Sequence, residues 1–307
     1  MANYYCMMAG LPDITLDSPA AVDMDELREQ MDMALTEHDK RLIFYFFLER
    51  DCKNLVRLLK NPEAEIVADG NYTMEQYRDL ITSAREMNFN VHRYPAFMSE
   101  FARNFDYNKG KAGWFAEDAM QLAFYEYAIQ CPNRMISAWY SLNLDITNIL
   151  TAMIARKNGW DVADYIQGEN DVTEMILTNS AKDFNLSSEY DYIKDLVKIV
   201  ECEDPVKKEK QIDAFKWIWL EEQTFFDVFS IEAVFAYLCK LDMLERWGKL
   251  DAQQGKERFS QIIEDLRGEA KVPEEFQLKQ VAGTKSAERL SPSEYNKEAS
   301  GYNRSER

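Results

Sequence analysis

The sequence predicts an all-α protein, and three observations support this fold class. The 307 residues include only 11 glycines and 8 prolines, fewer than the many turns of a β-sandwich or β-barrel would need. Fourteen methionines accompany many Leu, Ala, Glu and Lys residues, which favour helices. Apolar residues make up 46% of the chain, enough for a sizeable core, and they recur at helical spacing over long stretches.

This periodicity divides the chain into helices joined by short loops. Pro62 ends the first long helix, because the residue before a proline disfavours helical geometry. Thr73 and Gln76 form a capping box, and Pro132 and Gly159 are placed to begin and end a second long helix. The predicted helices cover residues 23–33, 37–60, 73–87, 95–105, 116–130, 132–158, 162–167, 172–177, 188–203, 205 onward, 231–247 and 251–266.

We expect residues 1–268 to form a single helical domain, because no composition change marks a linker inside them. Beyond Lys271, Ser, Glu, Lys, Gly and Asn dominate and the apolar periodicity stops. Residues 269–307 are therefore predicted to be a disordered tail that could become ordered on a partner.

Charge and cysteine content exclude several classes of protein. A net charge of −18 argues against a nucleic-acid partner, which requires a basic face, and suits a basic protein partner. The five cysteines are scattered and never form a CxxC pair, so neither a disulfide framework nor a zinc ribbon is expected. Cys52 and Cys239 lie in apolar helical stretches and are predicted to be core residues.

No segment reaches the ~18 uninterrupted apolar residues of a membrane span. The first residues, 1–11, lack the basic and apolar regions of a signal peptide. We expect a cytoplasmic protein whose association with a membrane, if any, is peripheral.

The sequence contains little that could carry chemistry. His38 and His92 are isolated, so no paired-histidine metal site is expected and both are predicted to be ordinary residues. The chain contains neither a G-x-x-x-x-G-K-[ST] phosphate loop nor a G-x-G-x-x-G fingerprint, so no nucleotide or other cofactor is expected. Glu221 and Glu222 could serve as a general acid or base in a reaction, although the preferred interpretation is that they lie on a solvated helix turn.

An aromatic cluster occurs near residue 220, formed by Trp217, Trp219, Phe225 and Phe226. It could line a binding pocket. Aromatic residues at helical spacing more often pack in a core, so we predict that these four do so.

The two long helices share a pattern at an offset of 94 residues. Asp51 and Asn54 in the first helix correspond to Asp145 and Asn148 in the second, each pair beside an apolar stripe. Asp and Asn cost up to ~0.7 kcal/mol each in a helix interior, so their recurrence suggests hydrogen-bond partners in a loop or a neighbouring helix. Chance recurrence is the alternative to internal duplication. A weaker third copy contains Asp242, and Glu245 replaces the Asn.

These motifs resemble those of the central-stalk C subunit of V/A-type ATPases, named the d subunit in eukaryotes, whose long helices carry D-x-x-N-L-like segments. Residues 50–59 resemble the first segment, residues 145–156 the second and residues 237–245 a degenerate third. The resemblance spans about residues 4–266 and indicates a divergent bacterial branch. After Tyr4 and Tyr5 the family's Ala-Arg continuation is replaced by residues 9–12, Ala-Gly-Leu-Pro.

The resemblance implies a pseudo-threefold arrangement of helical bundles, with repeats at about residues 1–110, 111–204 and 205–268. It also implies a non-catalytic central-stalk adaptor, peripheral on the cytoplasmic face of the inner membrane, that couples the rotor shaft subunits to the membrane rotor ring during ion transport or ATP synthesis. The six motif residues would be structural. Two alternatives stay open: a helical scaffold that binds a protein through its acidic surface, and a helical enzyme with a carboxylate-lined cavity.

Overall fold

The structure, a computed structural model, describes residues 4–18, 22–66, 69–86, 93–111 and 113–249. Within these residues every regular element is a helix, which confirms the predicted all-α class. Two short 3-10 turns, η2 (Val162–Asp164) and η3 (Leu186–Ser188), lie between α7 and α9. The α-helices are α1 (Tyr5–Gly10), α2 (Met24–Ala34), α3 (Glu37–Lys60), α4 (Met74–Glu86), α5 (Ala96–Asn108), α6 (Ala116–Ala128), α7 (Arg134–Asn158), α8 (Asp171–Thr178), α9 (Ile193–Glu201), α10 (Pro205–Thr224) and α11 (Ile231–Lys249).

Polar residues in front of the helices explain where several of them begin. The side chain of Thr36 accepts a hydrogen bond from a backbone N–H of α3, and the side chain of Asn133 accepts two from α7. Asp23, Asn170 and Asp204 do the same for α2, α8 and α10. Each cap provides an acceptor for N–H groups that have no partner inside the helix.

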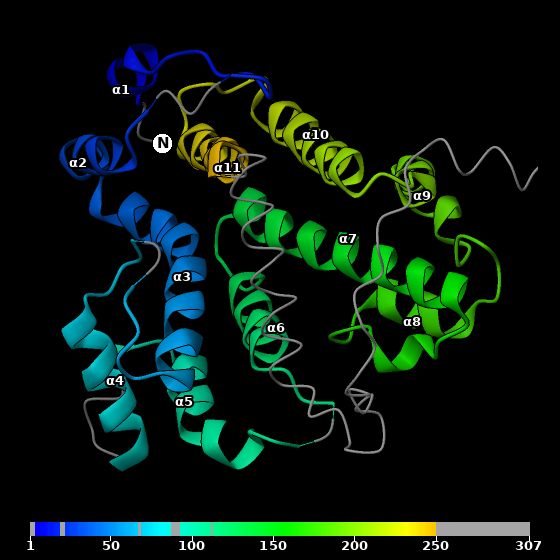
Figure 1. The fold of residues 1–307 in the computed structure, drawn as a ribbon. Coiled ribbons are helices and arrows are strands. Elements are labelled where there is room, and N and C mark those ends of the chain that lie inside the picture. The colour runs from blue at the N-terminus through cyan, green and yellow to red at the C-terminus, as the bar shows by residue number, and fades with distance from the viewer. Residues whose placement is uncertain (1–3, 19–21, 67–68, 87–92, 112, 250–307) are drawn as a thin grey trace, which may run out of the picture. The chain divides into compact units, whose positions relative to one another are not determined.

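The last described helix connects the two halves of the chain. Helix α3 packs against α5, α6 and α11, and α7 packs against α6, α8, α9 and α11. Figure 1 shows the chain running from α3 through α6 to α7, then through α8, α9 and α10 back to α11. Because α11 contacts both α3 and α7, the helices that carry the three predicted motif copies lie together. We call α3, α7 and α11 the motif helices.

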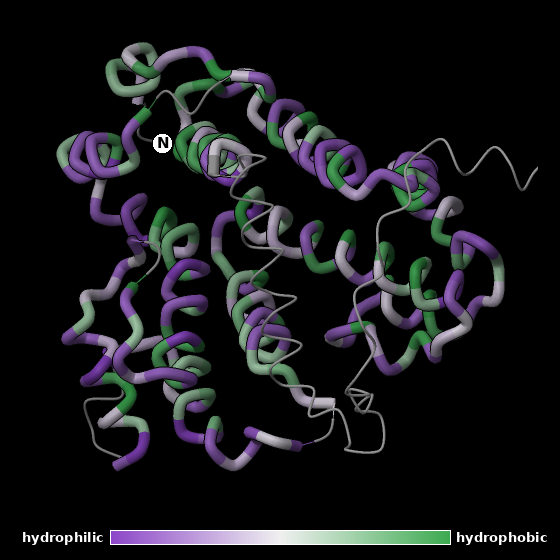
Figure 2. The backbone as a smooth tube through the Cα atoms, viewed as in Figure 1, coloured by the Kyte–Doolittle hydropathy of each residue, from purple (hydrophilic) through white to green (hydrophobic). Residues whose placement is uncertain are grey.

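The core consists of two hydrophobic clusters that share α7. The larger cluster takes side chains from α1 to α6, the first part of α7, α10 and α11. The smaller one takes them from the second part of α7, α8, η3, α9 and residue Ile212 of α10. Figure 2 shows hydrophobic residues recurring along the whole of α7, as its passage through both clusters requires. Cys52 and Cys239 are buried in the larger cluster, as predicted.

Three aromatic side chains mark the point where the motif helices meet. Phe235 of α11 lies edge-on to Phe46 of α3 and to Tyr140 of α7, with ring centroids 6.3 and 6.0 Å apart. The Tyr140 hydroxyl also donates a hydrogen bond to the backbone oxygen of Tyr45, at 3.0 Å. Phe46 and Tyr140 are separated by the same 94-residue offset as the Asp-Asn pairs, so equivalent positions of α3 and α7 contact one residue of α11.

Tyr4, the first described residue, is hydrogen-bonded to α3 and to the residues just before α11. Tyr4 is 5% exposed, and its backbone N–H donates to the oxygen of Phe229, at 2.8 Å, just before α11. Its hydroxyl donates to the Asp39 carboxylate in the first turn of α3. The short helix α1 follows directly.

Two predicted helices are much shorter than expected, and one of these, residues 162–167, contains only the 3-10 turn η2. Residues 188–203 contain only α9, which begins at Ile193 after η3. The Asp183 side chain accepts hydrogen bonds from the N–H of Asn185 and the hydroxyl of Ser187, and Asn185 has a φ of 59°. Further turns follow, in which the N–H of Tyr190 donates to the Leu186 oxygen and the N–H of Ile193 donates to the Tyr190 oxygen, and they delay the start of the helix. The predicted helix 251–266 and the predicted tail lie outside the described residues.

Candidate functional site

The Asp51 carboxylate, which is fully buried in α3, binds the loop that precedes α4. Its Oδ2 atom accepts hydrogen bonds from the backbone N–H and the side-chain amide of Asn71, at 3.0 and 2.7 Å. Its Oδ1 atom accepts from the Tyr72 N–H, at 3.2 Å, and from the Tyr77 hydroxyl, at 2.6 Å. Burial raises the pKa of Asp51, while the hydrogen bonds act in the opposite direction. The carboxylate therefore fixes this loop on α3.

Gly70 allows the loop to come this close. A Cβ atom on Gly70 would overlap the Asp51 carboxylate and would lie 3.0 Å from the Tyr77 hydroxyl oxygen. Arg28 also holds the loop by donating to the Gly70 oxygen at 2.8 Å, and the Asn54 side-chain amide donates to the hydroxyl oxygen of Tyr77 in α4 at 3.3 Å. Asp51 thus holds both the loop and α4, and Asn54 contacts α4 through Tyr77.

The second Asp-Asn pair binds the loop that precedes α8. The Asn148 side chain makes two hydrogen bonds with the backbone of Gln167, donating to its oxygen and accepting from its N–H, both at 2.8 Å. Asp145 Oδ1 accepts a hydrogen bond from the Asn170 side-chain amide, at 2.8 Å. Burial raises the pKa of Asp145 to about 6, and the nearby charge of Asp171 adds to the rise.

The same local arrangement occurs twice. In each case the buried Asp of a long motif helix binds an Asn side chain of the following loop, and a short helix begins at the end of that loop. The buried Asn binds Tyr77 of α4 in the first case and the Gln167 backbone of the loop in the second. A reciprocal capping box starts both short helices: Thr73 with Gln76 for α4, and Asn170 with Thr173 for α8. Because these motif side chains are buried, they hold the fold together and present nothing to a partner.

The third predicted copy makes different contacts. Asp242 is about half exposed and accepts a hydrogen bond from Arg50 of α3 at 2.7 Å, while Glu245 lies 3.9 Å from Arg50. Arg50 directly precedes Asp51 in α3. The ion pair between Arg50 and Asp242 therefore connects α11 to α3. A loop equivalent to the other two would follow α11, beyond the described residues.

Sequence reasoning missed the loop residues that complete the two arrangements. Asn71 follows Gly70 directly, and Asn170 lies two residues after Gly168. Each Gly/Asn segment follows a motif helix and leads into a capping box, which Asn71 precedes and to which Asn170 itself belongs. That order is a signal from which the partners of the two buried aspartates could have been found.

The motif helices begin around one hollow. Thr36, Asn133 and Ser230, the residues just before α3, α7 and α11, all line a cavity of about 440 Å³. Ser230 Oγ accepts a hydrogen bond from the N–H of Ala233 at 3.3 Å, as a capping residue does. The Asn133 amide donates to Glu232 Oε1 at 2.7 Å, which joins the starts of α7 and α11.

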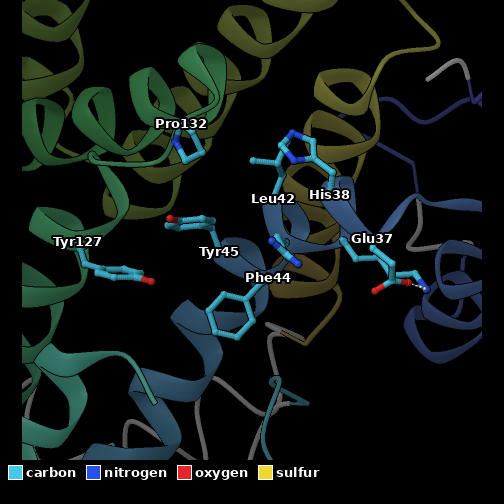
Figure 3. Close-up of a pocket in the computed structure, with 9 residues that line it drawn as sticks. Glu37, His38, Leu42, Phe44, Tyr45, Tyr127 and Pro132 are labelled. Atoms are coloured by element: carbon cyan, nitrogen blue, oxygen red, sulfur yellow. Dashed lines mark hydrogen bonds and ion pairs between the residues drawn. The ribbon is translucent and has the colours of Figure 1, made fainter. Parts of the chain in front are cut away.

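A groove of about 540 Å³ adjoins this hollow, and both are lined by His38 and Leu42. Figure 3 shows His38 and Leu42 of α3 facing Pro132, which precedes α7. Deeper in the groove, the rings of Tyr45 and Tyr127 stack with centroids 5.6 Å apart. We call the hollow and the groove together the N-terminal recess. Its wall combines apolar rings with the polar residues Glu37, His38, Asp39, Lys40, Arg41 and Glu232.

The charges of the recess suit the helix ends that meet there. Each helix N-terminus carries a partial positive charge, which nearby carboxylates stabilise. Glu37 and Asp39 lie in the first turn of α3, and Glu232 lies in the first turn of α11. Burial raises the pKa of Tyr45 to about 12, so its hydroxyl stays protonated at neutral pH. The recess therefore offers hydrogen-bonding groups and apolar surface for binding.

Two further findings concern metals and membranes. The described part of the chain contains no group of three or more His, Cys, Asp or Glu side chains placed to hold a metal ion. Its helices also include none with the length and apolar character needed to cross a membrane. His92 lies outside the described residues.

The aromatic cluster near residue 220 is divided between core and surface. Trp217 is buried, and Trp219 packs partly buried against both hydrophobic clusters. Phe225 and Phe226 are 72% and 96% exposed, so the predicted core position is wrong for them. Helix α10 ends at Thr224, which removes both residues from the helical face that their spacing suggested.

Comparison with known proteins places the chain in a family. A family model described as "Protein of unknown function (DUF2764)" matches residues 1–270, which include every described helix and the N-terminal recess. None of the curated proteins and none of the solved structures matches the chain. This protein belongs to the DUF2764 family.

Proposed function

We propose that this protein is a central-stalk adaptor of a rotary V/A-type ATPase, which couples the rotating shaft to the membrane rotor ring and catalyses no reaction itself. The observation that supports this proposal is the meeting of the three motif helices, with their capped N-termini, around one recess. An adaptor of this kind needs a socket built on a rigid core, because torque is lost in a compliant part.

The repeated architecture also favours the proposal. The resemblance to the central-stalk family implies three helical repeats around an axis, and the two buried Asp-Asn arrangements are equivalent parts of the first two repeats. Phe235 of α11 lies between equivalent residues of α3 and α7. In this proposal the recess receives the tip of the shaft, and the protein is peripheral on the cytoplasmic face of the inner membrane through the rotor ring.

The second candidate function is a helical scaffold for an unrelated basic protein, which the net charge of −18 favours. The two functions differ in what they bind and in how salt affects binding. A scaffold held by surface charge would release its partner as ionic strength rises. An adaptor that holds a shaft tip in a partly apolar socket would keep much of its binding.

Affinity purification of the tagged full chain from detergent-solubilised native membranes tests the proposal. We expect shaft, ring and catalytic ATPase subunits in the eluate, still present after a high-salt wash. Recovery of an unrelated basic protein that the wash removes would favour the scaffold. An eluate without ATPase subunits would exclude the adaptor function.

A substitution in the recess makes the test specific. His38 is exposed and lines both parts of the recess, so His38→Trp would narrow the recess without disturbing the core. We expect recovery of the shaft subunits to fall about tenfold, because a buried contact at the centre of an interface has an effect of that size. Lys157→Trp, an exposed site near the C-terminus of α7, is the matched control and should change nothing.

A further inference from the structure

A second surface on the molecule exposes large apolar side chains. Phe225 is 72% exposed, Phe226 is 96% exposed and Val228 is 50% exposed, all in the turn between α10 and α11. Tyr5 of α1, 58% exposed, contacts Phe229 of the same turn with ring centroids 4.8 Å apart. We call residues 225–229 together with Tyr5 the Phe turn. Exposed aromatic groups of this kind are typical anchors of protein interfaces.

The exposure is built into the turn by hydrogen bonds. The N–H of Asp227 donates to the oxygen of Thr224 at 3.2 Å, and the Ser230 hydroxyl donates to the oxygen of Asp227 at 3.0 Å. The Phe229 oxygen accepts from the Tyr4 N–H. The rings of Phe225 and Phe226 lie edge-to-face with centroids 5.0 Å apart. These bonds hold the backbone in a shape that directs both rings away from the core.

The surroundings of the Phe turn carry negative charge. Residues 217–239 contain four acidic residues and no Lys or Arg, and residues 4–18 contain two Asp and no basic residue. The next lysine along the chain, Lys240, is paired with Glu221 at 3.1 Å. Glu222 and Asp227, which flank the two exposed rings, are themselves exposed.

We propose that the Phe turn docks a segment of a partner protein in which apolar side chains are flanked by Lys or Arg. The apolar side chains would cover the two rings, and the basic groups would lie against Glu222 and Asp227. An anionic membrane surface does not fit, because attraction to it requires Lys or Arg around the apolar residues. A second copy of this chain does not fit either, since a twofold contact would bring acidic surroundings against each other.

This docking surface goes beyond the proposed adaptor function. The Phe turn leads into Ser230, so it adjoins the recess, but Phe225, Phe226 and the carboxylates of Glu222 and Asp227 are not among the residues that line the recess. The recess could receive a shaft whether or not the Phe turn binds anything. A test with isolated peptides therefore needs no ATPase subunit, and its outcome is separate from that of the membrane purification.

Binding of two helical peptides to the full chain tests the docking surface. Both peptides have about 18 residues and leucine along one face, and one carries lysine and the other glutamate on the opposite face. We expect the Leu/Lys peptide to bind at least about tenfold more tightly than the Leu/Glu peptide, measured by fluorescence anisotropy. The double variant Phe225→Ser/Phe226→Ser should lose about tenfold or more of the Leu/Lys affinity.

Matched controls separate the Phe turn from the general acidity of the chain. Met33 of α2 and Leu177 of α8 are exposed apolar residues, at 81% and 55%, so Met33→Ser/Leu177→Ser removes similar groups elsewhere. This control should keep wild-type affinity. An equal loss in both double variants, or equal binding of both peptides, would overturn the proposal.

Two other results would also overturn it. One is binding to phosphatidylglycerol vesicles that depends on the two phenylalanines, which would assign the surface to a membrane. The other is a dimer, seen by sedimentation velocity, that the phenylalanine variants dissociate. Circular dichroism melting of each variant checks that the fold is retained.

Discussion

Close approach between a glycine and a buried carboxylate determines how the first loop is held. Gly70 is itself buried, and its backbone lies against Asp51, whose two oxygens accept hydrogen bonds from Asn71, Tyr72 and Tyr77. A side chain on Gly70 would have to displace groups that depend on this carboxylate for their hydrogen bonds. The loop can bind α3 in this way only because residue 70 has no Cβ atom and residue 51 has a carboxylate.

We therefore expect Gly70→Ala to destabilise the protein. The added Cβ would push against the carboxylate, and such overpacking costs about 1–3 kcal/mol. The free energy of unfolding, measured by chemical denaturation, checks this. Gly248→Ala is the matched control because a Cβ there meets nothing within 4 Å, and it should be neutral or slightly stabilising. Equal stability of both variants and wild type would show that the loop can move away from Asp51 at little cost.

The loop before α8 is attached to its motif helix in a different way from the loop before α4. Asp51 accepts four hydrogen bonds, whereas within the described residues Asp145 accepts one, from Asn170. Asp145 is only 9% exposed, and its pKa of about 6 compares with an ordinary value of 3.8. Between these two pH values Asp145 binds more protons in the folded protein than in the unfolded chain. Its contribution to stability therefore falls as the pH rises from about 4 to 6.

Asp145→Asn should remove this dependence. The difference in unfolding free energy, variant minus wild type, should increase by up to ~3 kcal/mol as the pH rises from 4 to 7 and then stay level. Chemical denaturation across this range measures it. Asp118→Asn, at an exposed site on α6, should show no such increase.

The equivalent substitution in the first repeat should have the opposite effect at neutral pH. In Asp51→Asn an NH₂ group would face hydrogen-bond donors, so we expect a loss of about 2–4 kcal/mol. If Asp145→Asn destabilised the protein as much as Asp51→Asn at pH 7, the two loops would be held in the same way after all.

The helices could be predicted from the sequence because their signals are local. Apolar spacing, Pro132 and Gly159 located α7 closely, and Gly159 adopts the left-handed conformation expected of a helix end, with a φ of 72°. The error at 188–203 arose because successive turns occupy residues 186–193, where the N–H of Tyr190 donates to the Leu186 oxygen and the N–H of Ile193 donates to the Tyr190 oxygen. Phe225 and Phe226 were misplaced because periodicity alone does not show where α10 ends.

The site was less predictable because it depends on distant pairs. The sequence indicated that Asp51 and Asp145 need partners, but Asn71 and Asn170 lie 20 and 25 residues further along. Only the folded loops bring each pair together. The recess could not be predicted either, since it requires the starts of three separate helices to meet.

At the scale of the whole molecule, the contact between α3 and α11 unites the domain. The Arg50 side chain is largely buried, lies over the rings of Phe46 and Phe47, and donates to Asp242. It therefore combines apolar packing, a cation–π contact and an ion pair in one connection between helices that are distant in sequence. Of these contributions, the half-exposed ion pair is the weakest, because water screens it.

Arg50→Ala should consequently destabilise the whole domain more than loss of the ion pair alone. We expect a loss of about 2 kcal/mol for Arg50→Ala and less than about 1 kcal/mol for Asp242→Asn. Denaturant unfolding followed by tryptophan fluorescence measures both. Equal effects of the two substitutions would assign the connection to its charges and not to its packing.

The anchoring of Tyr4 has a consequence for how the protein is made. Its acceptor at Phe229 lies 225 residues away, and the Tyr237 hydroxyl donates to the oxygen of Pro12 across the same number of residues. While the polypeptide is being synthesised, the segment that contains α1 can reach α2 and α3, but it lacks its partners Phe229 and Tyr237 until α11 has left the ribosome. We expect residues 4–12 to stay more accessible to proteases on chains stalled before α11 has left the ribosome and to become protected on chains long enough to expose it. Residues 4–12 would then reach their final contacts only after more than 200 later residues have been synthesised.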